Sequence, residues 1–217
     1  HPCQQLPVSM GLAQRGHDCD LLLNQNPLPD LPARYHGRVP PSCKLLAGST
    51  FALLSQQFTD LRAVLVRDFG PVRRILVALG GADESGFTVT VLKTIEDTLA
   101  AALELNVVVG YANPHKSQIR ELCSNKPNAI YYEQTDRMAE LIAAADIAVG
   151  AGGSSQWERC CLGLPSINIA IASNQEEAMQ VLADREGCIY LGPAASFERF
   201  RLDGAIDELV VDADRRR

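Results

Sequence analysis

The spacing of hydrophobic positions changes regularly along the chain from Arg73 onward. Short runs of aliphatic and β-branched residues alternate with segments in which apolar residues recur every three or four positions. The runs predict strands over 75–79, 106–109, 129–132, 147–149, 166–171 and 188–191, and the segments predict helices over 88–102, 117–123, 136–145, 154–162 and 175–186. This alternation indicates βαβ units, and hence an α/β fold with a mostly parallel, Rossmann-like sheet between helices.

Residues 1–70 lack this regular alternation. Five prolines lie between Asn24 and Pro41, where they interrupt regular elements. Only a helix over 8–15 and a strand over 20–23 are predicted, although residues 45–65 again include apolar side chains. This is too little for an independent second core. We therefore predict that residues 1–70 form a linker and the remnant of a second domain, that residues 71–217 form the Rossmann-like domain, and that a polar, fraying helix occupies 203–217.

The composition is that of an ordinary globular protein, and it narrows the class of partner. Of the 217 residues, 47% are hydrophobic and 21% are charged, and the formal net charge is -6. Because basic residues cluster only at the extreme end of the chain, we expect no nucleic-acid partner. No apolar run reaches the roughly 20 residues that span a bilayer, and no leader pattern opens the chain. We therefore expect no membrane partner and a cytoplasmic protein.

Seven cysteines are spread along the chain without a Cys-x-x-Cys pair or a nearby cluster of cysteine and histidine. The pattern predicts neither a disulfide framework nor a zinc site. We expect reduced thiols that act as small, mostly buried side chains. No metal and no cofactor are expected.

A glycine-rich junction, GAGGSS at 150–155, joins the strand predicted over 147–149 to the next helix. In a parallel sheet, ligands bind beyond the carboxyl ends of the strands, where such junctions lie. Glycines let the backbone approach a ligand closely, and the free N–H groups of a helix start attract an anion. A diphosphate fits this junction, although the spacing is neither G-x-G-x-x-G nor that of a P-loop.

Glu158 lies one turn into the helix that follows this junction. Its carboxylate could accept hydrogen bonds from two neighbouring hydroxyl groups, as on a ribose, while phosphates lie against the glycines. The alternative is a capping box formed by Ser155 and Glu158, which would only satisfy the donors of the helix start. On spacing alone, the capping box is slightly favoured.

Two further strand-to-helix loops have polar, turn-forming sequences. The loop over 80–85 reads GGADES and could place N–H groups beside the same ligand, but the residues by themselves favour a turn capped by Asp83 or Ser85. In the other loop, Asn174 and Gln175 could contact a polar ligand or cap a helix, and the two interpretations are evenly balanced.

Histidine is the usual acid–base residue at neutral pH, and the chain has four: His1, His17, His36 and His115. The loop position of His115 and the polar, proline-rich surroundings of His17 and His36 predict solvated side chains. No Ser-His-Asp arrangement can be assembled from the spacing.

The segment GAGGSSQWERCCLGLP over 150–165, followed by Asn174 and Gln175, resembles a known family. It is similar to the nucleotide-sugar hydrolases of pseudaminic acid biosynthesis, which remove UDP from UDP-2,4-diacetamido-2,4,6-trideoxy-β-L-altropyranose. RILVALGGAD over 74–83 and DLLLNQN over 20–26 support the resemblance, which covers about 18–192. The family is similar in fold to two-domain GT-B glycosyltransferases, including the GlcNAc transferase of peptidoglycan synthesis.

The resemblance implies roles for several residues. The chain would contain the carboxyl-terminal, UDP-binding half of a GT-B-type fold, preceded by a truncated remnant of the amino-terminal domain. Glu158 would bind the ribose, Gly152, Gly153 and Ser154 would lie against the pyrophosphate, and Asn174 would contact the nucleotide-sugar. Gly81 belongs to a loop in which family members often carry an asparagine a few positions on, where this chain has Gly86.

The family's catalytic group is a histidine in a Gly-x-Gly-His motif, and His1 is the position that could match it. By resemblance it would activate a water that attacks the anomeric carbon, with no metal required. The glycines and the strand that precede this histidine in the family are absent here. We therefore expect a UDP-sugar hydrolase, with two alternatives: a glycosyltransferase of GT-B type and a non-catalytic UDP-sugar binding module.

Overall fold

The computed structural model describes residues 19–217, and their contacts divide the chain into two units between Leu53 and Leu54. In the first unit, strands β1 (Leu21–Asn24) and β2 (Lys44–Ala47) pair in parallel, and α2 (Leu31–Tyr35) and the 3-10 turn η1 (Ser49–Phe51) complete it. The strand predicted over 20–23 is confirmed, displaced by one residue. Pro32 lies in the first turn of α2, where a missing N–H group is tolerated.

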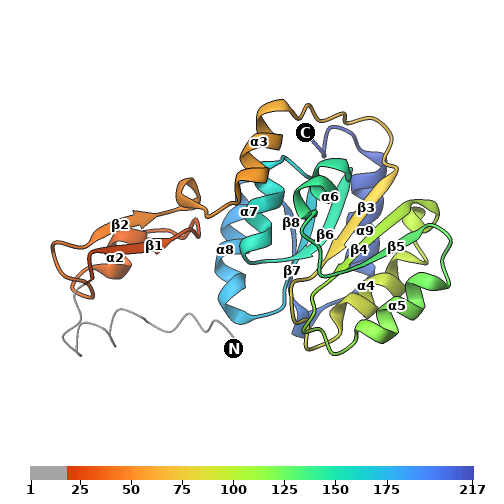
Figure 1. The fold of residues 1–217 in the computed structure, drawn as a ribbon, viewed down its shortest axis with the longest axis horizontal. Helices are drawn as coiled ribbons and strands as arrows, with labels where there is room; N and C mark the ends of the chain where they lie inside the picture. Colours follow the sequence, from red (N-terminus) through yellow and green to blue (C-terminus); the bar gives the residue numbers. More distant parts are fainter. Residues whose placement is uncertain (1–18) are drawn as a thin grey trace. The chain divides into compact units, whose positions relative to one another are not determined.

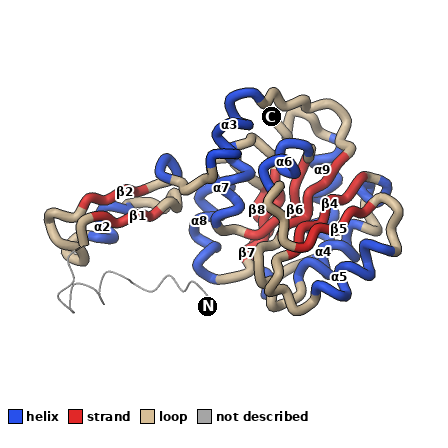
Figure 2. Tube along the Cα trace, viewed as in Figure 1, coloured by secondary structure: helices blue, strands red, loops and turns tan. Residues whose placement is uncertain are grey.

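The second unit contains a six-stranded sheet and most of the helices (Figures 1 and 2). Its strands are β3 (Arg74–Ala78), β4 (Glu104–Val109), β5 (Ala129–Glu133), β6 (Ile147–Ala151), β7 (Ser166–Ala170) and β8 (Ile189–Pro193). Its α-helices are α3 (Gln56–Val64), α4 (Phe87–Ile95), α5 (Lys116–Ser124), α6 (Met138–Ala144), α7 (Ser154–Cys161), α8 (Ser173–Asp184) and α9 (Arg199–Val211), with 3-10 turns η2 (Leu99–Ala102) and η3 (Ala194–Ser196). Every recorded strand pair is parallel, so the predicted α/β fold is confirmed.

The order of the strands creates a switch point at the centre of the sheet. The order is β5-β4-β3-β6-β7-β8, so the chain builds outward from β3 on one side and then returns to continue from β6 on the other. In such a sheet, the loops after the two central strands diverge and leave a crevice in which ligands bind. The loops after β3 and β6 are the two glycine-rich loops at 80–85 and 150–155.

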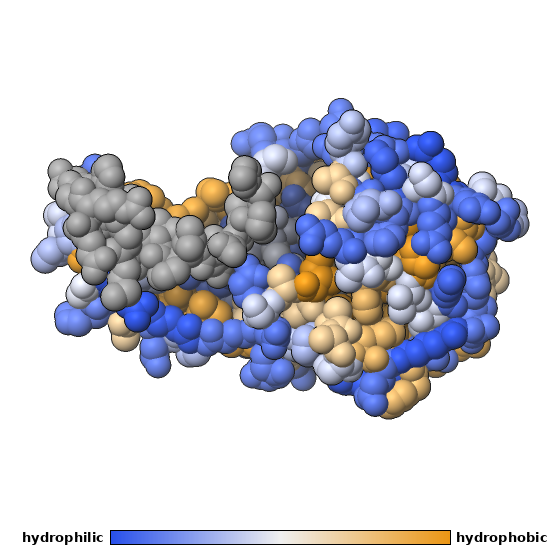
Figure 3. Space-filling view, turned by 90° about the horizontal axis from the view of Figure 1, so that it is seen from below, coloured by the Kyte–Doolittle hydropathy of each residue, from blue (hydrophilic) through white to orange (hydrophobic). Residues whose placement is uncertain are grey.

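Both faces of the sheet are covered, which explains why the central strands read as continuous apolar runs. On one face, alternate residues of β3 such as Ile75 and Val77 pack with buried side chains of α4, α5 and α9. On the other face, Leu76 and Ala78 pack with residues of α3 and α6. The surface of the second unit that is visible in Figure 3 is mostly hydrophilic, with a smaller group of hydrophobic residues.

In the first unit, α2 and β2 were not predicted, and the helix predicted over 8–15 lies outside the described residues. Three elements of the second unit also differ from the sequence prediction. The helix expected over 88–102 ends at Ile95, and the 3-10 turn η2 follows, in which the Thr98 side chain accepts a hydrogen bond from the backbone of Ala100. The helix expected to fray over 203–217 begins earlier, at Arg199, and is anchored in the core by Leu202, Ala205, Ile206 and Leu209. Helix α3 was not predicted at all, and the division between units lies at Leu53 rather than at residue 70, because α3 packs against α6 and α7 of the second unit.

Arg67, in the segment after α3, forms hydrogen bonds with the carboxyl-terminal ends of two helices. Its guanidinium donates to the carbonyl oxygens of Ile142 and Ala145 at the end of α6 (2.7 and 2.6 Å), and to that of Leu162 at the end of α7 (2.7 Å). The last carbonyl groups of a helix lack partners within the helix and attract positive charge. Arg67 therefore supplies both hydrogen bonds and charge at these positions.

We expect Arg67→Ala to lower the free energy of unfolding by about 2 kcal/mol, because it leaves these helix-end carbonyls without their charged donor. Urea denaturation followed by circular dichroism measures the change. The control is Arg62→Ala on the exposed side of α3, for which a change within about 0.5 kcal/mol is expected. Equal stabilities of the two variants would contradict the role given to Arg67.

Candidate functional site

Three loops meet at the carboxyl edge of the sheet around the switch point. Strand β6 pairs with β3 on one side and with β7 on the other, with Ala78 beside Gly150 and Gly150 beside Asn168. The backbone of Gly152 donates to Ile169 (3.2 Å). The loops at 80–85, 150–155 and 171–175 are therefore neighbours, and the residues predicted to bind UDP lie on these loops and the helices that follow them, at one edge of the sheet.

Each glycine of the loop after β6 is favoured at its position for a different physical reason. A Cβ at Gly150 would lie 2.6 Å from Nη1 of Arg159, and one at Gly152 would lie 2.7 Å from Cγ of Met179 on α8. Gly153 has a φ of +136°, a conformation that side chains disfavour, and it precedes the first residue of α7. The lack of side chains at these positions thus lets α7 and α8 pack closely and leaves the backbone of Gly153 open.

Glu158 does not form the capping box that its spacing allowed. Helix α7 begins at Ser154 with Gly153 as its N-cap, and no side chain caps it. Ser155 is therefore already inside the helix, and its hydroxyl instead lies 3.4 Å from Nη1 of Arg159. The capping-box interpretation, slightly favoured by spacing, is wrong, because a box with Ser155 as its N-cap requires a helix that starts at Gln156, two residues later than α7 does.

The carboxylate of Glu158 is half-buried one turn into α7. Among residues 19–217, no hydrogen bond or ion pair of this side chain is recorded. Burial raises its pKa, and the positive charge of the neighbouring Arg159 partly offsets this effect. A half-buried carboxylate without a partner is suited to accept hydrogen bonds from the hydroxyl groups of a ligand.

The loop after β3 is a capped turn, as its residues favoured. The buried carboxylate of Asp83 accepts hydrogen bonds from the backbone of Phe87 (2.8 Å) and from the backbone and hydroxyl of Thr88 (2.9 and 2.6 Å). Gly81 is exposed and fits closely against Gly110, at which an added Cβ would lie 2.1 Å from the Gly81 oxygen. The loop is therefore held rigidly at the carboxyl edge, with its outer face open.

Asn174 lies in the first turn of α8 and is exposed. No side chain caps α8, while the side chain of Gln175 accepts a hydrogen bond from the backbone of Ile171 (3.0 Å). The cap that the sequence allowed for this pair is thus absent, and Gln175 closes the preceding turn instead. Asn174 remains a predicted contact of the nucleotide-sugar.

Two of the four histidines, His36 and His115, lie in the described part of the chain. His1 and His17 lie outside the described residues, and His36 is exposed. His115, expected to be solvated, is half-buried, and its Nε2 lies 3.1 Å from the carbonyl oxygen of Glu84 in the loop after β3. It packs there because Gly86 has no side chain, and a Cβ at that position would lie 3.0 Å from the imidazole.

Arg159 is a component of the site that the sequence analysis missed. Its side chain is 1% exposed and lies beneath the loop after β6, where it contacts Gln156 and Asn168. An arginine on an amphipathic helix usually extends to solvent, so no local pattern marks it as buried. The available signal was the glycine at position 150, whose missing side chain makes room for the guanidinium.

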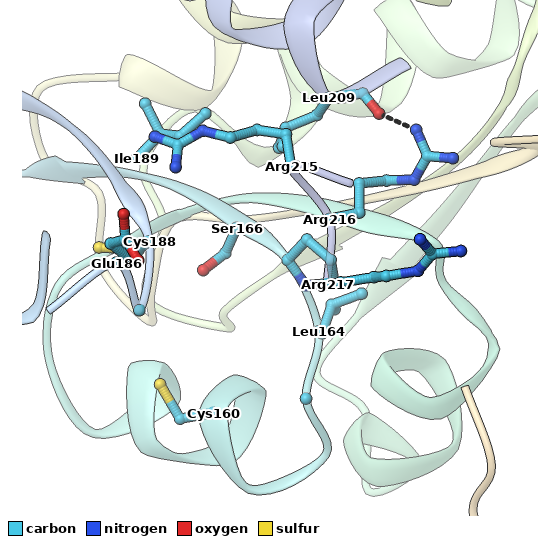
Figure 4. A pocket seen from close by; sticks show the side chains of 13 residues that line it. Cys160, Leu164, Ser166, Glu186, Cys188, Ile189, Leu209, Arg215, Arg216 and Arg217 are labelled. Atoms are coloured by element: carbon cyan, nitrogen blue, oxygen red, sulfur yellow. Dashed lines mark hydrogen bonds between the residues drawn. The ribbon is translucent and has the colours of Figure 1, made fainter. Parts of the chain in front are cut away.

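A cavity of about 300 Å³ lies away from these loops (Figure 4). It is lined by residues 164–166 and 187–189, at the amino-terminal ends of β7 and β8, and by 215–217. Because the glycine-rich loops are at the opposite edge of the sheet, this cavity is separate from the predicted nucleotide site. In residues 19–217 there is no cluster of three or more side chains suited to bind a metal ion. No helix in the same range is long and apolar enough to cross a membrane.

Comparison with known proteins identifies relatives of the second unit. The family model for the glycosyltransferase family 28 C-terminal domain matches residues 75–216. The spore coat polysaccharide biosynthesis protein SpsG of Bacillus subtilis is 35% identical over 122 residues, which cover 55% of this chain and 36% of SpsG. The uncharacterized protein MJ1062 of Methanocaldococcus jannaschii is 30% identical over 100 residues, which cover 44% of this chain and 20% of that protein.

Solved structures give the same fold. MurG of Acinetobacter baumannii has a TM-score of 0.59 at 14% identity, covering 96% of this chain and 63% of MurG. At this identity the likeness shows the fold alone, and it confirms the GT-B-like, Rossmann-like architecture. The match to SpsG extends over about a third of that relative's length.

Proposed function

The chain belongs to the glycosyltransferase family 28 C-terminal domains, and from this premise we propose that its second unit binds the diphosphate and nucleoside of a sugar donor, with UDP as the nucleotide. The observation that carries the proposal is the junction of β6 with α7. There the switch point, an open glycine backbone, a helix start and the unpaired carboxylate of Glu158 occur together. A helix start at a switch point is suited to a diphosphate, and an unpaired carboxylate is suited to the hydroxyl groups of a ribose.

Each of the three neighbouring loops binds a different part of the nucleotide-sugar. Gly152, Gly153 and Ser154 lie against the pyrophosphate, which the N–H groups at the start of α7 bind. Glu158 accepts hydrogen bonds from the two ribose hydroxyl groups. Gly81 and Asn174, on the loops at either side, contact the remainder of the nucleotide-sugar. These assignments rest on the family resemblance, and the position of the residues at the carboxyl edge of the sheet supports them.

The reaction that we propose is transfer of the sugar to an acceptor hydroxyl during polysaccharide assembly. The acceptor oxygen attacks the anomeric carbon, and the bond from that carbon to the diphosphate oxygen breaks. UDP leaves with the electron pair, and a base takes the proton of the acceptor. Transfer agrees with the family of this chain and with SpsG, whose name places that protein in the biosynthesis of a spore coat polysaccharide. The base proposed from the sequence, His1, lies outside the described residues.

Hydrolysis is the second candidate, and the sequence segment over 150–165 favours it. In that reaction water replaces the acceptor hydroxyl, and UDP-2,4-diacetamido-2,4,6-trideoxy-β-L-altropyranose is the substrate. The nucleotide-binding part of the site is the same for both reactions, because each reaction releases UDP from the anomeric carbon. The difference lies in what attacks that carbon.

A phosphorus NMR time course of the 217-residue chain separates the candidates. Release of UDP from UDP-GlcNAc only when a sugar acceptor is added supports transfer. Release from the altropyranose donor in the absence of an acceptor supports hydrolysis. Broadened donor signals without release support a binding module, and donor signals unchanged by excess protein overturn the proposed nucleotide site.

A further inference from the structure

Arg159 is a buried cation without a close anionic partner. Its side chain is 1% exposed, and no ion pair recorded for residues 19–217 includes it. The carboxylate of the preceding residue, Glu158, attracts it at a distance but does not pair with it. Burial lowers the pKa of the guanidinium to about 10, so Arg159 remains charged at neutral pH. A buried charge of this kind is costly unless something compensates it.

Neutral groups satisfy most of the donors of Arg159. Its Nη2 donates to the carbonyl oxygen of Ala151 (2.7 Å), to Oε1 of Gln156 (2.8 Å) and to Oδ1 of Asn168 (3.0 Å). Its Nη1 lies 3.4 Å from Oγ of Ser155, and its Nε has no partner within the described chain. The guanidinium is therefore held in one place, while its charge is not neutralised.

The guanidinium lies directly beneath the glycine-rich loop. Gly150 is beside Asn168 in the sheet, and a Cβ at Gly150 would lie 2.6 Å from Nη1 of Arg159. The contacts with Ala151 and Ser155 join the two ends of the loop segment 152–154 to one rigid group. Any substitution that fills this space would displace the cation and the loop together.

The position of this charge is unfavourable in the absence of a ligand. The start of a helix carries a partial positive charge, which attracts anions and repels cations. Arg159 extends back to the first turn of α7, so its charge adds to that of the helix start at the same place. An anion bound at loop 152–154 would compensate both.

Resting on the proposed nucleotide site, we infer that Arg159 is a positioning and specificity-determining residue: its guanidinium fixes loop 152–154 and supplies the positive charge that makes the site select a nucleoside diphosphate over the uncharged nucleoside. The diphosphate is the counter-ion that the buried cation lacks. The ligand does not touch the guanidinium, and the effect is transmitted through the loop and the electrostatic field.

The test compares UDP with uridine by calorimetry on the full 217-residue chain. Two variants abolish the uncompensated positive charge, one by deleting the cation and the other by adding an anion beside it. Arg159→Gln deletes the cation, whereas Asn168→Asp leaves Arg159 in place and gives it a carboxylate at the position of the 3.0 Å contact. We expect each variant to lower the ratio of UDP affinity to uridine affinity by about tenfold, because both remove the uncompensated charge. Asn168→Asp keeps an oxygen at the contact with the guanidinium, but it loses the hydrogen bond that Nδ2 of Asn168 donates to Oε1 of Gln156 (2.5 Å), so the melting temperature of each variant is measured beside its affinities.

A purely structural role for Arg159 predicts a different pattern. Arg159→Gln would then weaken UDP and uridine by the same factor, and Asn168→Asp would leave the ratio unchanged. That result overturns the inference. If only one of the two variants folds, the affinity ratio of that variant decides the test. Arg62→Gln on the exposed side of α3 is the matched control, with an unchanged ratio expected. Failure of the wild-type chain to bind UDP would overturn the proposed function itself, whereas wild-type binding with unchanged ratios would overturn only the role of Arg159.

Discussion

Replacement of Glu158 by alanine is expected to weaken UDP binding by about 2–3 kcal/mol, or roughly 30- to 150-fold, because the ribose loses charge-assisted hydrogen bonds. The carboxylate has no recorded partner among residues 19–217, and it caps no helix, so the loss should fall on the ligand rather than on the fold. Isothermal titration calorimetry with UDP measures the effect. The matched control is Glu121→Ala on the exposed side of α5, for which no change is expected.

The pH dependence of the Glu158 variants distinguishes binding from stability. Burial raises the pKa of Glu158 above the ordinary glutamate value, so the folded protein binds this proton more tightly than the unfolded chain does. The contribution of Glu158 to stability is therefore fully present below the ordinary pKa and is lost as the pH rises through the raised one. Glu158→Gln should accordingly raise the melting temperature at pH 7 but not in acid.

The same Glu158→Gln variant should bind UDP less tightly at pH 7, because the amide is a weaker acceptor than the carboxylate. Higher stability together with lower affinity is what a ligand-binding carboxylate predicts. If the variant is less stable at pH 7 and binds UDP with the affinity of the wild type, Glu158 has a structural role instead of a ligand-binding one. Thermal melts and calorimetry on one preparation measure both quantities.

Gly110→Ala is expected to lower the free energy of unfolding by about 3 kcal/mol, the upper end of the usual cost of overpacking. The new Cβ would lie 2.1 Å from the oxygen and 2.4 Å from the Cα of Gly81, and both are backbone atoms. A flexible side chain could move aside at little cost, whereas the backbone of the loop after β3 is held by hydrogen bonds to Asp83, so it can move only at a cost in stability. The loop should also shift away from the nucleotide site, so UDP affinity should fall with stability.

Gly204→Ala is the control for this prediction, since the chemical change is the same. Gly204 lies inside α9, and a Cβ there would meet nothing within 4 Å. Alanine in a helix interior is favoured over glycine, so this variant should gain about 0.5–1 kcal/mol. Urea denaturation of both variants should give changes of opposite sign. A loss of less than about 0.5 kcal/mol for Gly110→Ala would show that the close approach to Gly81 is easily relieved.

The local pattern of the sequence determined the strands and most of the helices of the second unit. Apolar runs and three-to-four spacing depend only on which side chains face the core, and this information lies within each segment. The pattern failed where the deciding contact is distant in sequence. Helix α3 is stabilised by its packing against α6 and α7, and the start of α9 is set by the apolar residues that this helix buries. The composition of the two helices does not reveal these contacts.

The sequence by itself therefore determined the α/β class and the glycine-rich loop that could hold an anion. Only the tertiary structure decided that β6 lies beside β3, which puts the loops at 80–85 and 150–155 at a switch point. It also decided against the capping box, because α7 begins at Ser154 with Gly153 as its N-cap. Arg159 is the clearest case: its charge is written in the sequence, but its burial depends on the space that Gly150 leaves and on an acceptor supplied by a neighbouring strand.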